Sequence, residues 1–164
     1  MNGIQTIQSA LASTQFLLNA VLEDLSDADL LVRPVPGANH LAWQLGHVTA
    51  SEIGLVREQL PEAVYPPLPA GWAEAHAMPA TSKNGPDGFR TKAEYVKMLN
   101  EVRKATIEAV GKLQDSDLDR PSQGQMANFA PRLGDIFLLV ANHSLMHSGQ
   151  FSVLRRKLGK PVLF

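Results

Sequence analysis

The sequence predicts an all-α protein, a four-helix bundle with a long crossover connection between the second and third helices. Four segments carry apolar residues at the three- and four-residue spacing of amphipathic helices. Prolines and glycines separate these segments, and one separating stretch covers residues 61–90. At 164 residues the chain is long enough to bury a core without disulfides, so we expect a single bundle domain over residues 1–164.

The first two helices are expected at residues 4–25 and 39–60. The first has no internal proline, and its apolar residues recur at helical spacing: Ile4, Ile7, Leu11, Leu18, Val21, Leu22 and Leu25. Asn39 follows a proline- and glycine-containing stretch and is expected to cap the second helix. Pro61 then ends that helix.

The third and fourth helices are expected at residues 91–113 and 131–158. Thr91 and Glu94 have the T-x-x-E spacing of a capping box, in which each side chain bonds the other residue's backbone N–H. Pro131 suits the first turn of the fourth helix because its missing N–H needs no partner there. The four helices are each long enough to span a bundle.

The connection at residues 61–90 is longer than two adjacent antiparallel helices require, and it holds six of the eleven prolines. We therefore expect it to cross over along the bundle. Such a connection either covers a site or is a surface loop held by its prolines. Trp72 and His76 either pack over a pocket or anchor the loop, and His76 is expected to be solvated.

The most informative residues are His143 and His147, four positions apart in an apolar segment of the fourth helix. They share one helical face with mostly apolar residues: Ile136, Leu139, Val140, Gln150, Phe151, Leu154 and Leu158. Two inward-facing imidazoles need partners for their nitrogens, and this spacing lets both reach one metal ion. The alternative is a pair of core histidines that only form hydrogen bonds.

A catalytic metal site commonly takes three protein ligands, so a third is sought. His47 is the best candidate because it lies in the middle of the second helix, beside Gly46, which permits close approach of another helix. His40 lies beside the helix start, where an exposed or capping role is expected. Glu52 is five residues from His47, or about 140° around the helix, so it points away.

Three further polar residues are candidates for supporting roles. Gln44 and Ser51 flank His47 on the same side of the helix and could hydrogen-bond its second nitrogen or a bound ligand. Gln150 follows the histidine pair on the fourth helix and is a further candidate for contact with a histidine or a substrate. Gln44 and Ser51 could equally be ordinary polar residues where two helices meet.

The composition excludes several classes of function. With 15 basic and 16 acidic residues the net charge is −1, and no basic stretch suggests nucleic-acid binding. No apolar run approaches the roughly 18 residues that span a bilayer, and no secretory signal precedes the first helix, so we expect a cytoplasmic protein that does not enter membranes. The chain has no cysteine, so any thiol chemistry needs a thiol from a second molecule.

Two segments resemble the signature segments of the DinB-like superfamily of damage-inducible four-helix proteins. They are W-Q-L-G-H at residues 43–47 and N-H-S-L-M-H-S-G-Q at residues 142–150. In that family one histidine of the second helix and two of the fourth bind a divalent metal. The resemblance therefore implies that His47, His143 and His147 are metal ligands here.

The resemblance also implies a kind of chemistry. Related proteins include S-transferases and isomerases that use low-molecular-weight thiols such as bacillithiol or mycothiol. Many relatives carry arginine where this chain has Ser148, so an arginine contact with an acidic cosubstrate is not expected here. Several relatives are dimers, and a homodimer is expected by analogy.

Three imidazoles suit zinc or nickel, and they leave iron, cobalt or manganese open. The first hypothesis is an enzyme whose divalent ion activates an external thiol to attack a small-molecule substrate. The alternatives are a metal-dependent hydrolase, a non-catalytic metal- or ligand-binding protein with a stress role, and a purely structural bundle. The sequence assigns no residue to the chemical step itself.

Overall fold

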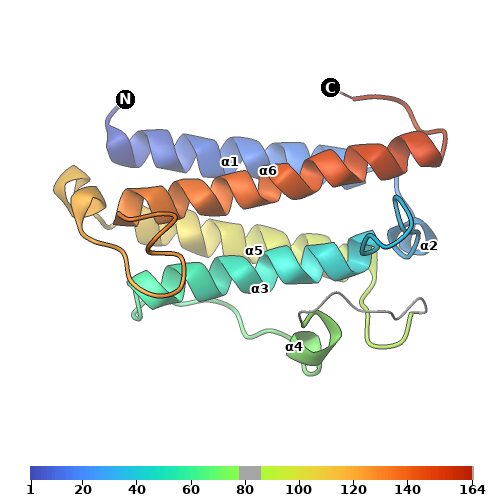
Figure 1. Cartoon of the computed structure of the whole chain (residues 1–164), viewed down its shortest axis with the longest axis horizontal. Coiled ribbons are helices and arrows are strands. Elements are labelled where there is room, and N and C mark those ends of the chain that lie inside the picture. Colours follow the sequence, from blue (N-terminus) through green and yellow to red (C-terminus); the bar gives the residue numbers. More distant parts are fainter. Residues whose placement is uncertain (78–85, 164) are drawn as a thin grey trace.

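The computed structural model describes residues 1–77 and 86–163, which form a bundle of long helices (Figure 1). The long helices are α1 (Gly3–Leu22), α3 (Leu41–Gln59), α5 (Lys92–Val110) and α6 (Leu133–Lys157). Shorter turns lie between them: α2 (Asp27–Leu30), α4 (Trp72–Ala75) and the 3-10 turn η1 (Asp115–Asp119). The described residues form no strand, so the predicted all-α four-helix bundle is confirmed.

The long helices pack in a closed ring in which α1 contacts α6, α6 contacts α3, α3 contacts α5, and α5 contacts α1. Helices α1 and α6 run in one direction, while α3 and α5 run in the other (Figure 1). Because α3 and α5 are parallel, the chain must return along the bundle between them. The predicted crossover is therefore confirmed, although its residues 78–85 lie outside the described part of the chain.

The helix starts follow from their capping side chains. Thr91 Oγ1 accepts the Glu94 N–H (3.3 Å), and the Glu94 carboxylate accepts the Thr91 N–H (2.9 Å), so the predicted capping box is confirmed. The predicted cap of the second helix was wrong by one residue. His40, not Asn39, caps α3, because His40 Nδ1 accepts the N–H of Trp43 at 3.1 Å.

Three other helix ends differ from the prediction by two or three residues. Helix α1 ends at Leu22 rather than position 25, and Ser26 caps the short helix α2 that follows. Helix α5 ends at Val110 rather than position 113. Helix α6 begins at Leu133, where the preceding Arg132 N–H is bonded to a carboxylate of the first turn.

A buried ion pair between Arg103 of α5 and Glu52 of α3 lies in the centre of the bundle, with both side chains at most 3% exposed. The Arg103 guanidinium donates to both Glu52 oxygens at 2.8–3.2 Å. It also donates to the Leu11 carbonyl and Thr14 Oγ1 of α1, and to Ser144 Oγ of α6. We call these side chains the arginine cluster, and it joins all four long helices.

Two clusters of buried apolar residues make up most of the remaining bundle interior. Burial of these side chains is the main favourable contribution to folding. None of the described helices combines the length and the apolar character needed to cross a bilayer.

Candidate metal centre

The structure brings His47, His143 and His147 together where α3 packs against α6. One ring nitrogen from each histidine lies within 4.8 Å of the others. The Nε2 atoms of His143 and His147 are 3.2 Å apart, and the His47 ring centroid is 5.2 Å and 5.7 Å from the other two. His147 is buried, while the other two are half-buried. We call these three residues the histidine cluster.

A hydrogen-bond chain fixes which nitrogen of His147 carries a proton. The Gln44 side-chain N–H donates to the Asn39 carbonyl at 2.8 Å, so Gln44 Oε1 faces His147. Oε1 then accepts the Nδ1–H of His147 at 2.7 Å. With the proton on Nδ1, the Nε2 of His147 presents its lone pair toward the other imidazoles. Gln44 therefore bonds a cluster histidine, but it bonds His147 rather than the predicted His47.

The ring of His47 is held by stacking on Trp43, which lies one helical turn earlier on α3. The two ring centroids are 4.8 Å apart and the planes are only 11° from parallel. Trp43 is itself buried. Trp43 was not predicted as a site residue, although its i−4 spacing from His47 is the signal that predicts this contact.

The crossover packs directly behind His47. Trp72 Nε1–H donates to the Gly46 carbonyl at 3.0 Å, and the ring of His76 lies over Gly46. A β-carbon at position 46 would lie 2.1 Å from His76 Cδ2. Gly46 thus permits close approach of the crossover rather than of another long helix. Trp72 and His76 anchor the crossover on α3.

The expectation that His76 is solvated was wrong. His76 is 5% exposed, and its ring nitrogens bond the Trp72 carbonyl at 2.7 Å and the Tyr95 hydroxyl at 2.8 Å. Long-range packing against α5 buries it. Of the two roles predicted for His40, the structure shows the capping role. His40 caps α3 and is fully buried rather than exposed.

In the part of the chain that the structure describes, none of the remaining polar candidates bonds a histidine of the cluster. Glu52 is not part of the histidine cluster, because it pairs with Arg103, in agreement with its predicted direction. Within the described residues, Ser51 and Gln150 are half-buried and form no hydrogen bond to a cluster histidine, so their contact with a substrate stays a prediction. Ser148 is buried, and its hydroxyl donates to the carbonyl of Ser144 on its own helix.

Burial lowers the pKa of every imidazole in the histidine cluster. The pKa of His143 falls to about 4, with a smaller contribution from the nearby His47. The pKa of His147 falls to about 3, because burial and the two neighbouring histidines disfavour its charged form. Burial also lowers the pKa of His47. All three rings are therefore neutral near pH 7, which is the form that binds metals.

The donor set fits a divalent ion that prefers nitrogen. Two nitrogens bound to one tetrahedral zinc at its usual bond length would lie roughly 3.3 Å apart, close to the observed 3.2 Å between His143 and His147. In the described part of the chain, no carboxylate joins the three histidines. Three neutral ligands would leave the full charge of the ion and one position for an external ligand.

The fold and the histidine cluster together define a four-helix protein with a candidate three-histidine metal centre. The chain belongs to the DinB superfamily, whose family model matches residues 10–151. This match confirms the resemblance seen in the two signature segments, which carry all three histidines.

Two solved structures show the same fold. A conserved protein from Enterococcus faecalis matches with a TM-score of 0.74 and 17% identity, covering 98% of this chain and 99% of that one. YfiT from Bacillus subtilis, described as a probable metal-dependent hydrolase with an unusual four-helix bundle topology, matches with a TM-score of 0.69 and 17% identity. That match covers 96% of this chain and 89% of YfiT. The comparison with curated proteins gave no significant match.

Proposed function

We propose that His47, His143 and His147 bind one divalent metal ion and that the protein is a metal-dependent enzyme acting on a small molecule. The observation that carries this proposal is the 3.2 Å approach of two Nε2 atoms within a group of three neutral imidazoles. In the DinB superfamily the matching histidines bind a metal, which supports the assignment. Zinc or nickel suits the nitrogen ligands best, and iron, cobalt and manganese are further candidates.

The surrounding residues have supporting roles in this proposal. Gln44 holds the proton of His147 on Nδ1, which leaves Nε2 free to bind the ion. Trp43 holds the plane of the His47 ring by stacking. A bound ion would lower the pKa of a thiol or a water molecule at its remaining position and so supply a nucleophile.

We favour a thiol over water as the activated group, which makes the protein an S-transferase. The buried carboxylate of Glu52 is engaged by Arg103 and does not serve as a base for water. A thiol with a pKa of about 8.5 loses its proton far more readily than water does. Because the chain has no cysteine, the thiol must come from a low-molecular-weight cosubstrate.

In the proposed reaction the thiolate sulfur attacks an electrophilic carbon of the second substrate. The sulfur–carbon bond forms while the bond to the leaving group breaks, and the leaving group departs with its electron pair. The proton of the thiol passes to solvent. Hydrolysis is the second candidate, because YfiT is described as a probable metal-dependent hydrolase and shares the fold.

The first test is the metal content of protein purified without a histidine tag or added metal. We expect about one divalent ion per chain by elemental analysis, because three ligands define one site. The triple variant His47→Ala/His143→Ala/His147→Ala should be folded by circular dichroism and free of metal. The matched control is His76→Gln, which alters a buried histidine outside the cluster and should retain the ion.

The second test compares the two chemistries. Metal-loaded protein is mixed with cysteine or coenzyme A and 1-chloro-2,4-dinitrobenzene, or separately with p-nitrophenyl acetate. Thiol-dependent release of chloride that the triple variant lacks supports the S-transferase. Metal-dependent ester cleavage alone favours the hydrolase. A tightly bound metal with neither activity favours a non-catalytic metal-binding protein with a stress role.

Two further expectations accompany this proposal. A cytoplasmic location is proposed because the proposed thiol cosubstrate stays reduced in that compartment. A homodimer is proposed by analogy with the family, and light scattering that gives the monomer mass would remove it.

A further inference from the structure

A hollow of about 610 Å³ lies beside α6 and reaches the histidine cluster. His143 forms part of its wall, and Leu138, Leu139, Asn142 and Met146 of the same helix continue that wall. The loop that precedes α6 closes the other side. We call this space the α6 hollow. Its volume is typical of sites that hold small molecules.

The walls of the α6 hollow are largely apolar although they face solvent. Phe129 is 74% exposed, Met146 is 55% exposed and Leu138 is 40% exposed, and all three line the hollow. A group of exposed large apolar side chains around one concave surface is typical of a binding site rather than of ordinary protein surface. The side chains predict a ligand with an apolar part.

The charged residues of the α6 hollow do not favour an anionic ligand. Arg132 is paired with Asp135 at 3.2 Å and with Asp119 at 3.9 Å, so one cation faces two carboxylates. The remaining polar group nearer to His143 is the neutral amide of Asn142. A neutral ligand would leave these ion pairs intact, whereas a carboxylate in the hollow would lie against Asp135 and would find Arg132 already paired.

We propose that the α6 hollow binds the apolar part of a neutral substrate and places its reactive end beside His143. The inference rests on the proposed function of the histidine cluster and extends it by naming the substrate class. The hollow shares His143 with the cluster, so a molecule that fills it lies against one of the three candidate metal ligands. The substrate class is a neutral alkyl or aryl electrophile rather than an acidic metabolite.

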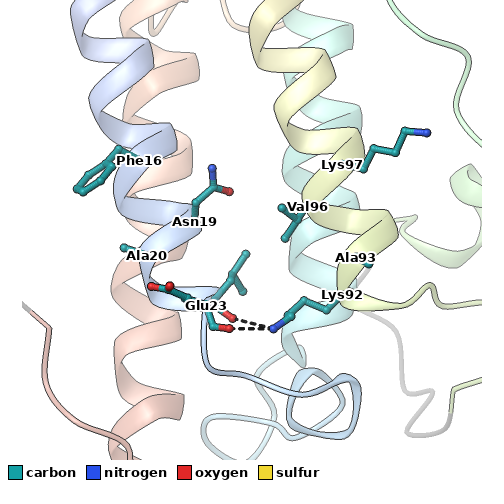
Figure 2. A pocket seen from close by; sticks show the side chains of 9 residues that line it. Phe16, Asn19, Ala20, Glu23, Lys92, Ala93, Val96 and Lys97 are labelled. Carbon is teal, nitrogen blue, oxygen red and sulfur yellow. Dashed lines mark hydrogen bonds between the residues drawn. The ribbon is translucent and has the colours of Figure 1, made fainter.

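A second hollow, of about 710 Å³, lies between α1 and α5 (Figure 2). Its walls include Phe16, Ala20 and Val96, and Lys92 closes one end by donating to the carbonyls of Leu22 and Glu23. This face of the bundle is opposite the α3–α6 interface. Although this hollow is larger, it contains no residue of the histidine cluster and serves as the internal comparison.

The test uses 1-hexanol and hexanoate, which share an apolar chain and differ in charge. Each is titrated into the ¹⁵N-labelled chain after a chelator has removed any metal, and binding is followed by the amide signals of Leu139, Asn142 and Met146. We expect saturable shifts with 1-hexanol and at least about fivefold weaker binding of hexanoate. Equal binding of the two compounds, or shifts confined to Phe16 and Val96, would overturn the proposal.

Paired substitutions on α6 locate the binding. Met146→Glu places a carboxylate in the wall and should weaken 1-hexanol binding by at least about fivefold. Leu145→Glu is the matched control, because Leu145 is similarly exposed but does not line the hollow, so binding should change by less than about twofold. An equal loss in both variants would mean that 1-hexanol binds elsewhere.

The same samples separate this inference from the proposed function. Elemental analysis of the chain before chelator treatment gives the metal content, while the titration uses the stripped chain. A chain that binds zinc but not 1-hexanol contradicts the α6 hollow alone. A chain that binds 1-hexanol in this hollow but takes no metal supports the hollow as a ligand site and contradicts the metal enzyme.

Discussion

The bundle interior holds two polar clusters that differ in how their hydrogen-bonding groups are used. In the arginine cluster, Arg103 donates to groups on the three other long helices, and both Glu52 oxygens accept from it. In the histidine cluster, the rings converge on one another, and two Nε2 atoms face each other at 3.2 Å. Both clusters lie at contacts of α3 with its neighbours.

The difference indicates what each cluster contributes. Each charge in the arginine cluster meets an opposite charge within the protein, so the cluster needs nothing from outside and serves the fold. The histidine cluster directs nitrogen lone pairs at a common point, where only a proton or a metal ion would satisfy them together. The arginine cluster is thus satisfied by the protein itself, whereas the three converging nitrogens of the histidine cluster are also suited to share one ion.

Breaking the arginine cluster should have the largest effect on stability. Glu52→Ala leaves the Arg103 charge buried and unpaired, so we expect the free energy of unfolding to fall by about 3–5 kcal/mol. Urea denaturation measures this change. The matched control is Glu101→Ala, whose ion pair with Lys97 is exposed and should contribute less than about 1 kcal/mol. Equal losses would contradict a structural role for the buried pair.

Zinc binding to the histidine cluster should have the next largest effect on stability. Zinc that binds only the folded chain raises the free energy of unfolding by about 2.7 kcal/mol when free zinc is about 100 times Kd. Urea denaturation with and without zinc tests this, and a chelator should reverse the gain. The triple histidine variant should show no gain. If zinc does not change the stability of the wild-type chain, the histidine cluster serves only the fold, as the arginine cluster does.

The contact between the crossover and α3 should contribute less to the free energy of unfolding. Its control substitution should change that free energy in the opposite direction. Gly46→Ala places a β-carbon against His76, so we expect a net loss of about 1–2 kcal/mol despite better helix propensity. Gly54→Ala lies on the same helix with no atom within 4 Å of its β-carbon, and it should gain about 0.5–1 kcal/mol. Thermal or urea unfolding separates the two, and a gain in both variants would refute the contact.

Substitution of Gln44 tests whether its hydrogen bond to His147 contributes to zinc affinity. Gln44→Ala removes the acceptor for Nδ1–H, so we expect zinc affinity to fall by about tenfold. The metal-free chain should also lose about 1–3 kcal/mol of stability, because the buried Nδ1–H and the Asn39 carbonyl lose their partner. Competition with a chromophoric chelator measures the affinity. Gln59→Ala, at the far end of α3, should keep the affinity within about twofold. An unchanged affinity for Gln44→Ala would make that hydrogen bond irrelevant to metal binding.

The sequence predicted the features that depend on one helix alone. The four-residue spacing of His143 and His147 places both rings on one face whatever the partner helix is. The same reasoning excluded Glu52 from the site. Thr91 and Glu94 likewise form their capping box from local spacing, and the structure confirms it.

Contacts between elements could not be predicted in the same way. Gln44 bonds His147 rather than His47 because the rotation of α3 against α6 decides which ring it meets. His76 is buried by α5 and by the missing side chain at Gly46, and neither contact is local. Arg103 lies on the helical stripe of Leu99 and Val110, but a charged residue is expected outside unless its partner is known.

The stacking of Trp43 on His47 gives the protein an optical reporter of its own. The chain has only two tryptophans, and the second, Trp72, bonds the carbonyl of the residue just before His47. Indole emission responds to the charge and polarity of whatever lies against the ring. Events at His47 are therefore expected to alter the intrinsic fluorescence, and a Trp72→Phe variant would report them through a single indole.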